Sequence, residues 1–268
     1  MTLIAHLSDL HVMPAAGDRF HGIDPLARAR RAISTLYQLP EVPRIVFITG
    51  DLSDRGEPAS YRAVCEVVAE LERLGSRVVL ALGNHDDRAA FRRVVLGQTD
   101  GGDAPWYHST VVDGLQVIVL DSSVPGVSHG ALDDAQLAWL AAQLAEPAPA
   151  GRLVALHHPP PPCPVRALGD GFVLRQPAAL ATLLHGCGVH AVLAGHVHMP
   201  STGSFAGVPV VTAPALAYAI DPLALTMVRG VAASGFALGW LGAGSLVTTP
   251  VWLATARDVL FEERPTPR

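Results

Sequence analysis

The chain is short of positive charge, and this shortage excludes one large class of partners. Among its 268 residues there are 19 lysines and arginines against 24 aspartates and glutamates, so the net charge is -5. A protein that holds a nucleic-acid polymer through its phosphates normally shows a basic excess. We therefore expect a small-molecule substrate and no nucleic-acid polymer as partner.

Cysteine is also scarce. Cys65, Cys163 and Cys187 are odd in number and widely spaced, which is the pattern neither of a disulfide framework nor of a paired zinc-thiolate site. The first six residues lack the basic segment and apolar run that mark a signal peptide. Both observations favour a cytoplasmic location.

One long stretch has no charge at all. Residues 230–254 are uncharged and numerous enough to span a bilayer. They also contain several glycines and Pro250, and the stretch breaks at Gly242-Ala243-Gly244. We interpret it as two buried strands joined by a turn, and expect no membrane span.

Half of the residues are hydrophobic and only 16% are charged, which allows a sizeable buried core. Short apolar runs alternate with amphipathic helical patterns, which is typical of an α/β architecture with buried sheets. The expected helices cover residues 25–39, 57–74 and 133–144. The expected strands cover residues 3–7, 45–48, 78–82, 117–120, 153–156 and 191–193.

The pattern favours one domain over residues 1–268, with residues 215–268 as a strand-rich C-terminal extension. Asp113-Gly114 suits a tight hairpin turn and so predicts a mixed sheet. The proline-rich run at residues 159–164 is too short to separate two domains.

Potential metal ligands follow five of the apolar runs, at the strand ends where open α/β sheets bind their ligands. These side chains are Asp9 and His11, Asp51, Asn84 with His85 and Asp86, His157 with His158, and His196 with His198.

Each motif alone has an ordinary explanation. A Gly-Asp pair is usually a turn, Asn and Asp cap helices, and a lone histidine is more often a satisfied core residue. Five such motifs in succession, all after apolar strands, instead indicate a metal centre. Carboxylate, amide and imidazole ligands without thiolate suit Mn, Fe or Zn. The candidates are too many for one ion but fit two divalent metal ions that share a carboxylate.

The order Asp9-x-His11, Gly50-Asp51, Gly83-Asn84-His85-Asp86, His157-His158, Gly195-His196-x-His198 resembles the calcineurin-like metallophosphoesterases. The surrounding residues, including the segments 22–24, 50–58 and 121–126, are most similar to the class III cyclic nucleotide phosphodiesterase branch. Bacterial glycerophosphodiesterases share much of this pattern.

The resemblance implies a four-layer αββα sandwich, in which helices flank two mixed sheets. It also implies that His85 is not a ligand but a catalytic residue, which faces the phosphate, stabilises the transition state and protonates the leaving oxygen. Asn84 and His85 would both contact the substrate. Asp86 would orient His85, although capping of a helix explains Asp86 equally well. The implied ligands are Asp9, His11, Asp51 and His198 for the first metal, and Asp51, Asn84, His157 and His196 for the second. His157 is preferred over His158 because the family's ligand comes first in this motif.

The implied activity is phosphodiester hydrolysis, with 3′,5′-cAMP or 2′,3′-cAMP as leading substrates and in-line attack by a metal-bridging hydroxide. A glycerophosphodiesterase or phosphomonoesterase of the same superfamily is the alternative, and a metal-poor protein-binding scaffold is the non-enzymatic one. A homodimer is one assembly that the resemblance allows. His21, Tyr61 and His129 either border the site or are ordinary surface and packing residues.

Overall fold

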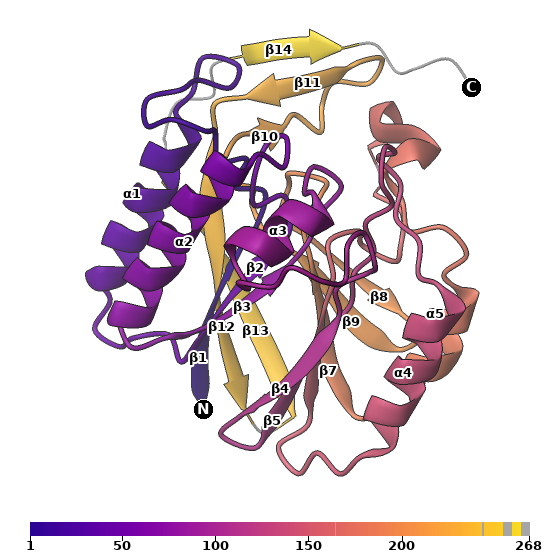
Figure 1. Cartoon of the computed structure of the whole chain (residues 1–268). Coiled ribbons are helices and arrows are strands. Elements are labelled where there is room, and N and C mark those ends of the chain that lie inside the picture. The colour runs from indigo at the N-terminus through magenta and orange to yellow at the C-terminus, as the bar shows by residue number, and fades with distance from the viewer. Residues whose placement is uncertain (164, 243, 254–258, 264–268) are drawn as a thin grey trace.

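Two mixed β-sheets pack against each other at the centre of the molecule, and helices cover their outer faces (Figure 1). The computed structural model describes residues 1–163, 165–242, 244–253 and 259–263. Helices α1 (Pro25–Tyr37) and α2 (Pro58–Arg73) lie on one side of the paired sheets, and α4 (Asp134–Ala145) and α5 (Ala178–Leu184) on the other. The four-layer α/β sandwich expected from the sequence is confirmed.

The first sheet has the strand order β13-β12-β1-β2-β3. Its parallel part comprises β1 (Thr2–Leu7), β2 (Ile45–Thr49) and β3 (Arg77–Ala81), linked by α1 (Pro25–Tyr37) and α2 (Pro58–Arg73). The antiparallel strands β12 (Gly235–Gly242) and β13 (Ser245–Trp252) complete it. A mixed sheet results because β12, from the C-terminal part of the chain, pairs with β1.

The second sheet has the order β4-β5-β6-β7-β9-β8. Neighbouring strands from β5 to β9 run parallel, and a hairpin closes each edge. The strands are β4 (His108–Val112), β5 (Leu115–Val119), β6 (Arg152–Ala155), β7 (Val189–Ala194), β8 (Ser201–Phe205) and β9 (Val208–Thr212). The helical segments nearby in the chain are α3 (Arg88–Val94), α4 (Asp134–Ala145), a 3-10 helix (Arg166–Phe172) and α5 (Ala178–Leu184).

A small third sheet joins β10 (Ala219–Ile220), β11 (Val228–Val231) and β14 (Val259–Glu263). It lies beyond one end of the larger sheets in Figure 1.

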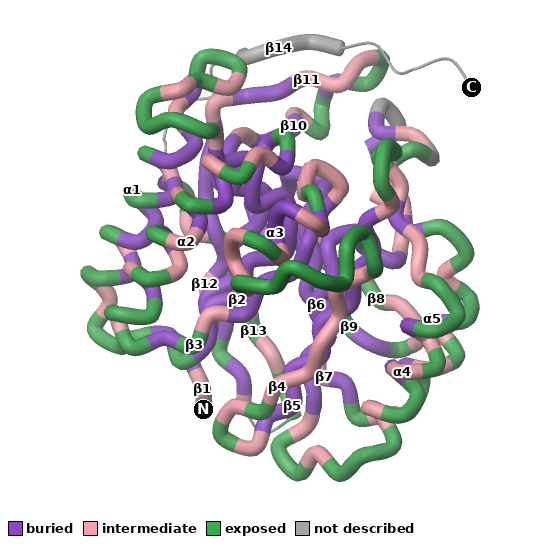
Figure 2. The backbone as a smooth tube through the Cα atoms, in the orientation of Figure 1, coloured by how far each residue is buried: buried purple, intermediate pink, exposed green. Residues whose placement is uncertain are grey.

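Apolar side chains fill the three interfaces between the four layers. Ile4 and Phe47 of the first sheet meet Val117 and Leu193 of the second, and all four are fully buried. A second cluster joins the first sheet to α1 and α2, and a third joins the second sheet to α4 and α5. Figure 2 shows the same pattern, with the central strands buried and the outward parts of helices and loops exposed. This apolar burial is the main force that holds the layers together.

The local signals read from the sequence also hold. Asp24 caps α1 by accepting a hydrogen bond from the backbone N–H of Ala27, and Pro25 begins the helix. Asp113 and Gly114, with φ of 52° and 82°, form the two-residue turn between β4 and β5. Two consecutive positive φ values are the signature of the primed hairpin turn that Asp-Gly predicts.

The expectation of two buried strands in residues 230–254 is half wrong. Strand β12 is largely buried because it has a partner on each side, whereas β13 is an edge strand with mostly exposed or half-buried residues. Val247 is 63% exposed and Trp252 is 44% exposed. Within the described residues, no helix is long and apolar enough to cross a membrane. Pro164, Ala243 of the expected turn, Ala254 and residues 255–258 and 264–268 of the expected extension lie outside the described residues.

Candidate metal centre

Five of the predicted ligands have a backbone conformation that ordinary residues avoid. Nine non-glycine residues of the described chain have positive φ, and five of these nine are predicted metal ligands. They are Asp9 (φ 54°), His11 (47°), Asp51 (48°), His196 (69°) and His198 (53°). Such conformations cost free energy, and they persist where the surrounding structure enforces them, often at functional sites. Here they bend the chain at strand ends, so that side chains from different strands converge.

The first group of converging side chains comprises Asp9, His11, Asp51 and His198, whose potential ligand atoms all lie within 4.8 Å of one another. Nε2 of His11 lies 3.2 Å from Nε2 of His198 and 3.5 Å from Oδ2 of Asp51. Nε2 of His198 lies 3.4 Å from Oδ1 of Asp9. The ring of His198 is held by its other nitrogen, since Nδ1 donates to the main-chain oxygen of Tyr218 at 2.8 Å. That bond leaves Nε2 as the atom that faces the group.

The second group forms around His157, Asn84 and His196. Nδ1 of His157 donates to the main-chain oxygen of Thr49 at 2.7 Å, so its Nε2 faces inward, 3.3 Å from Oδ2 of Asp51. Nε2 of His157, Nε2 of His196 and Oδ1 of Asn84 are buried without a hydrogen-bond partner in the described chain. Buried polar atoms are nearly always paired, so three unpaired ones at one place are what a bound cation would satisfy.

Asp51 joins the two groups. Its Oδ2 lies within 3.5 Å of Nε2 of His11 on one side and within 3.3 Å of Nε2 of His157 on the other. A carboxylate in this position can bridge two ions. The donor set of carboxylate, amide oxygen and imidazole fits a pair of divalent metal ions.

The charge states also favour metal binding. Burial alone would raise the pKa of Asp51, but the neighbouring His157, His85 and His11 lower it well below its usual value. Burial lowers the pKa of His198 to about 4 and that of His196 well below its usual value, so both imidazoles are neutral. His157 differs: burial opposes protonation, but the charge of Asp51 raises its pKa to about 9. A cation beside Asp51 would displace that proton, as metals do at histidine ligands.

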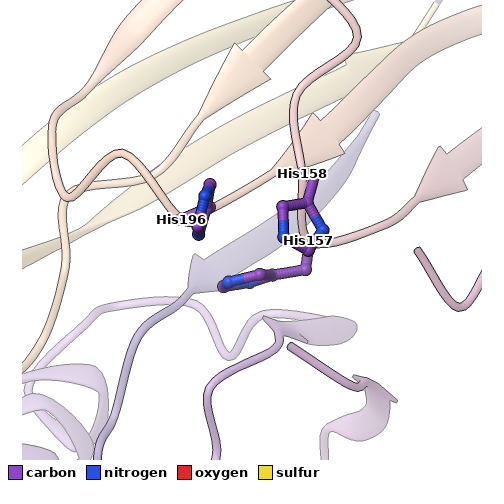
Figure 3. Close-up of side chains that lie close together, drawn as sticks. All are labelled: His157, His158 and His196. Carbon is purple, nitrogen blue, oxygen red and sulfur yellow. The ribbon is translucent and has the colours of Figure 1, made fainter. Parts of the chain in front are cut away.

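His157 and His158 are adjacent in sequence but have different surroundings. Figure 3 shows both imidazoles together with that of His196. Nδ1 of His158 lies 2.9 Å from Oγ of Ser122, and its Nε2 lies 3.2 Å from the main-chain oxygen of Ser128. Both ring nitrogens of His158 are therefore engaged, and burial lowers its pKa to about 3. His158 lies close enough to His157 and His196 to share a metal with them. Its hydrogen bonds instead favour a structural role.

His85 borders the two groups and is more accessible than the ligands around it. Its side chain is 38% exposed, and its backbone N–H donates to Oδ1 of Asp51 at 3.0 Å. Nδ1 of His85 lies 2.8 Å from the main-chain oxygen of Asp54 and 3.9 Å from its Oδ1. The carboxylate of Asp54 also lies 3.4 Å from Nδ1 of His11. Sequence reasoning did not single out Asp54, although it falls within the segment 50–58 that carries the resemblance.

Asp86 has partners other than those expected. Its carboxylate accepts hydrogen bonds from the backbone N–H groups of Leu52, Ser53 and Gly83, and from the hydroxyl of Tyr61. These bonds tie the loop that carries Asp51 to the loop that carries Asn84. The alternative that Asp86 caps a helix is wrong, because Asp87 occupies the N-cap of α3 and accepts from the N–H of Ala90. The described contacts of Asp86 do not include the ring of His85.

A pocket of about 270 Å³ adjoins the centre beside Asn84 and His85. Arg55, Ser123 and Gly126 also line it. The other residues suggested from the sequence divide: the side chain of Tyr61 is fully buried beneath Asp86, whereas His21 is exposed beside Phe20, 4.3 Å away between ring centroids.

Comparison with known proteins adds independent information. The profile of the calcineurin-like phosphoesterase family matches residues 2–200. A Rhodococcus erythropolis protein named probable cyclic nucleotide phosphodiesterase is 42% identical over 81% of this chain and 72% of its own length. A cAMP/cGMP dual specificity phosphodiesterase of Mycobacterium tuberculosis is 41% identical over 85% of this chain and 70% of its own. Among solved structures, a dimetal phosphatase from Danio rerio shares the fold, with a TM-score of 0.67, 16% identity and 99% of both chains covered.

Proposed function

The chain belongs to the calcineurin-like phosphoesterase family, and we propose that it is a two-metal phosphodiesterase that hydrolyses cyclic nucleotides, 3′,5′-cAMP or 2′,3′-cAMP. Family membership supports ester hydrolysis with metal ions. The names of the Rhodococcus and Mycobacterium relatives support the narrower choice of a cyclic phosphodiester. The three cysteines are free, which fits the cytoplasm, the compartment in which we place the enzyme.

The observation that carries the proposal is the position of Asp51 between two groups of buried, inward-facing ligand atoms. On one side we assign Asp9, His11 and His198, and on the other Asn84, His157 and His196. When bound, two divalent ions such as Mn, Fe or Zn polarise phosphoryl oxygens and make water a better nucleophile at neutral pH. The chain supplies the frame that holds both ions at one phosphate.

His85 is the residue that we assign to proton transfer. Because its Nδ1 donates to the main-chain oxygen of Asp54, Nε2 is the nitrogen available to the substrate. The carboxylate of Asp54 lies 3.9 Å from Nδ1, on the side of the ring away from Nε2. Protonated His85 can then donate from Nε2 to a phosphoryl oxygen or to the leaving ribose oxygen.

Asp86 acts indirectly, through the loops that carry two of the assigned ligands. By holding the N–H groups of Leu52 and Gly83, its carboxylate fixes the distance between the loops of Asp51 and Asn84. We therefore assign Asp86 to positioning both loops, in place of orienting His85.

The test is a rate comparison on one panel of esters after the protein has been stripped with chelator and reloaded with Mn. The panel contains 3′,5′-cAMP, 2′,3′-cAMP, a glycerophosphodiester, an aryl diester and its monoester. The variants are His85→Ala and Asn84→Ala, and the control is His185→Ala, an exposed histidine at the end of α5. We expect metal-dependent hydrolysis of a cyclic nucleotide that is lost in both site variants and kept in the control.

Other outcomes would replace the proposal. A preference for the glycerophosphodiester or the monoester would make that reaction the activity of this enzyme. A protein that binds no metal and hydrolyses none of the esters would instead be a binding scaffold on a phosphoesterase fold.

A further inference from the structure

A cluster of aromatic rings borders one side of the candidate metal centre. The ring of Phe20 stacks on that of His11, with centroids 5.4 Å apart and an interplanar angle of 17°. The ring of Tyr218 lies 4.3 Å from that of His198 and 5.6 Å from that of Phe20. We refer to Phe20 and Tyr218 as the aromatic platform. Two rings from distant parts of the chain thus meet directly beside two candidate ligands of the first metal.

The platform is accessible, unlike the ligands that it touches. The side chains of Phe20 and Tyr218 are half-buried and the neighbouring His21 is exposed, whereas His11 and His198 are buried. Phe20 belongs to none of the apolar core clusters of the described chain, so core packing does not account for its position.

Hydrogen bonds hold the backbone at both platform residues. Phe20 and Ile23 exchange two backbone hydrogen bonds across a tight turn, in which His21 and Gly22 have φ of 48° and 81°. Ile23 is buried and precedes the capped start of α1, so the turn is anchored to the helix. The main-chain oxygen of Tyr218 accepts the hydrogen bond that orients His198. A platform that is fixed before binding loses little entropy when a ligand stacks on it.

A third aromatic side chain near the centre serves as a contrast. Phe172 stacks on His196 with centroids 5.1 Å apart. Unlike Phe20, Phe172 packs against an apolar core cluster that includes Leu168 and Met199. Tyr218 also packs against this cluster, so packing contributes to the positions of both Phe172 and Tyr218. Phe20 has no such contact with a core cluster of the described residues, and it is the ring whose position packing leaves unexplained.

We propose that Phe20 and Tyr218 form the surface on which the nucleobase of the substrate stacks, and that they determine the preference for nucleotides over small alkyl diesters. The inference rests on the proposed function, since it assumes a phosphate held beside Asp51 and His85. His11 touches both regions, with its ring 5.4 Å from Phe20 and 4.7 Å from His85, so a ribose can link the phosphate to a base on the platform. Stacking on an aromatic face accepts any base, because every base has a π-face. The platform therefore favours adenine and guanine nucleotides alike.

The first test measures binding rather than turnover. Titration calorimetry on the metal-loaded protein compares adenosine 5′-monophosphate with ribose 5-phosphate, which has the same phosphate and sugar but no base. Loss of one stacking contact typically weakens binding roughly five- to 150-fold. We expect wild type to prefer the nucleotide by a factor in this range. In the double variant Phe20→Leu/Tyr218→Leu, the ratio of the affinity for the nucleotide to that for ribose 5-phosphate should fall close to one. The affinity for ribose 5-phosphate and the metal content should stay unchanged.

Matched variants separate stacking from structural damage. Phe172→Leu removes an aromatic ring beside the opposite ligand and should keep the wild-type preference, as should Tyr218→Phe. Phe20 lies outside the core clusters of the described residues, so the single variant Phe20→Leu should fold. It provides the test if the double variant fails to fold. A wild-type preference that survives in Phe20→Leu, or a wild type without any preference, would overturn the inference.

Rates on 3′,5′-cAMP and on glycerophosphoethanolamine distinguish this failure from failure of the proposed function. If wild type hydrolyses the cyclic nucleotide and the platform variants lose kcat/KM for it alone, both proposals stand. If the platform variants keep the wild-type kcat/KM for the cyclic nucleotide, the inference about the platform is wrong and the proposed function stands. If wild type hydrolyses no cyclic nucleotide, the proposed function falls, and the binding comparison still decides whether the platform holds a base.

Discussion

The main-chain oxygen of Asp54 accepts a hydrogen bond from Nδ1 of His85 at 2.8 Å. The same residue reaches a candidate metal ligand with its carboxylate, which lies 3.4 Å from Nδ1 of His11. Asp54 thus contacts both the residue proposed to move a proton and one proposed to hold a metal. Its backbone oxygen orients His85 and its carboxylate supplies negative charge beside His11, and a substitution can separate these two effects.

Asp54→Asn keeps the backbone oxygen and removes the negative charge. The tautomer of His85 should therefore survive, while its ring loses the negative charge of the carboxylate 3.9 Å away. Changes in groups that support ligands typically cost about 10- to 100-fold in activity or metal affinity. We expect a loss of kcat/KM in that range, smaller than the roughly 10²- to 10⁴-fold loss of His85→Ala. Equal losses in the two variants would show that the backbone bond alone does not orient His85.

Substitution of the two adjacent histidines tests the assignment of the second metal. His157→Gln removes an imidazole whose Nε2 is buried without a partner in the described chain, whereas His158→Gln removes one whose nitrogens contact Ser122 and Ser128. We expect the first variant to bind one metal ion per chain and the second to keep two, as measured by elemental analysis after dialysis. His158→Gln should still lower the melting temperature, because two buried hydrogen bonds are worth about 0.5–1.5 kcal/mol each. Loss of metal from His158→Gln instead would reverse the assignment.

The sequence predicted those parts of the site that depend on local pattern. Apolar strands followed by Asp51, Asn84 or His157 are recognisable within a few residues, and parallel strands bring such ends to one edge of a sheet. The domain division and the homodimer remain predictions, since they depend on surfaces and partners that local pattern does not encode.

Contacts between distant segments escaped prediction. The pairing of β12 with β1 places part of the C-terminal region inside the first sheet, and leaves β13 as an exposed edge strand. Tyr218 meets Phe20 only because the chain after β9 returns to the loop before α1. Asp86 was misjudged for a related reason: its backbone-binding role depends on Leu52 and Ser53 of another loop. The spacing of residues in the sequence does not directly predict contacts between such distant segments.

Gly83 is required by the close approach of two loops. A Cβ at this position would overlap Oδ1 and the backbone nitrogen of Asp51 and would lie 2.9 Å from its Cγ. We expect Gly83→Ala to displace the shared carboxylate, abolish detectable activity, reduce metal binding and destabilise the protein by about 1–3 kcal/mol. Gly171→Ala is the control, because an added Cβ there would meet no described atom within 4 Å, and its stability should change by less than about 0.5 kcal/mol. Calorimetric melting and metal analysis of both variants measure these effects, and a fully active Gly83→Ala enzyme would contradict the tight packing.

His6 should make stability depend on pH through a residue outside the metal centre. It lies in β1 with 1% exposure, its Nε2 is 2.9 Å from Oγ1 of Thr49, and its Nδ1 has no hydrogen-bond partner among the described residues. Burial lowers its pKa from the ordinary 6.5 to about 3. Between these values the unfolded chain binds a proton that the folded one excludes, so the free energy of unfolding falls as the pH drops from 6.5 towards 3.

The expected size follows from the same shift. At pH 5, His6 should cost the folded state about 2 kcal/mol relative to neutral pH, at about 1.4 kcal/mol per pH unit. His6→Leu has no proton to bind and should lack this component, whereas His185→Leu, at an exposed position, should retain it. Urea unfolding of the chelator-treated proteins at pH 7 and pH 5 gives the difference directly, and subtraction of the wild-type and variant curves cancels every other titrating group. If the free energies of unfolding of His6→Leu and wild type change equally between pH 7 and pH 5, the prediction is wrong. The buried imidazole would then take up a proton in the folded state as readily as in the unfolded state.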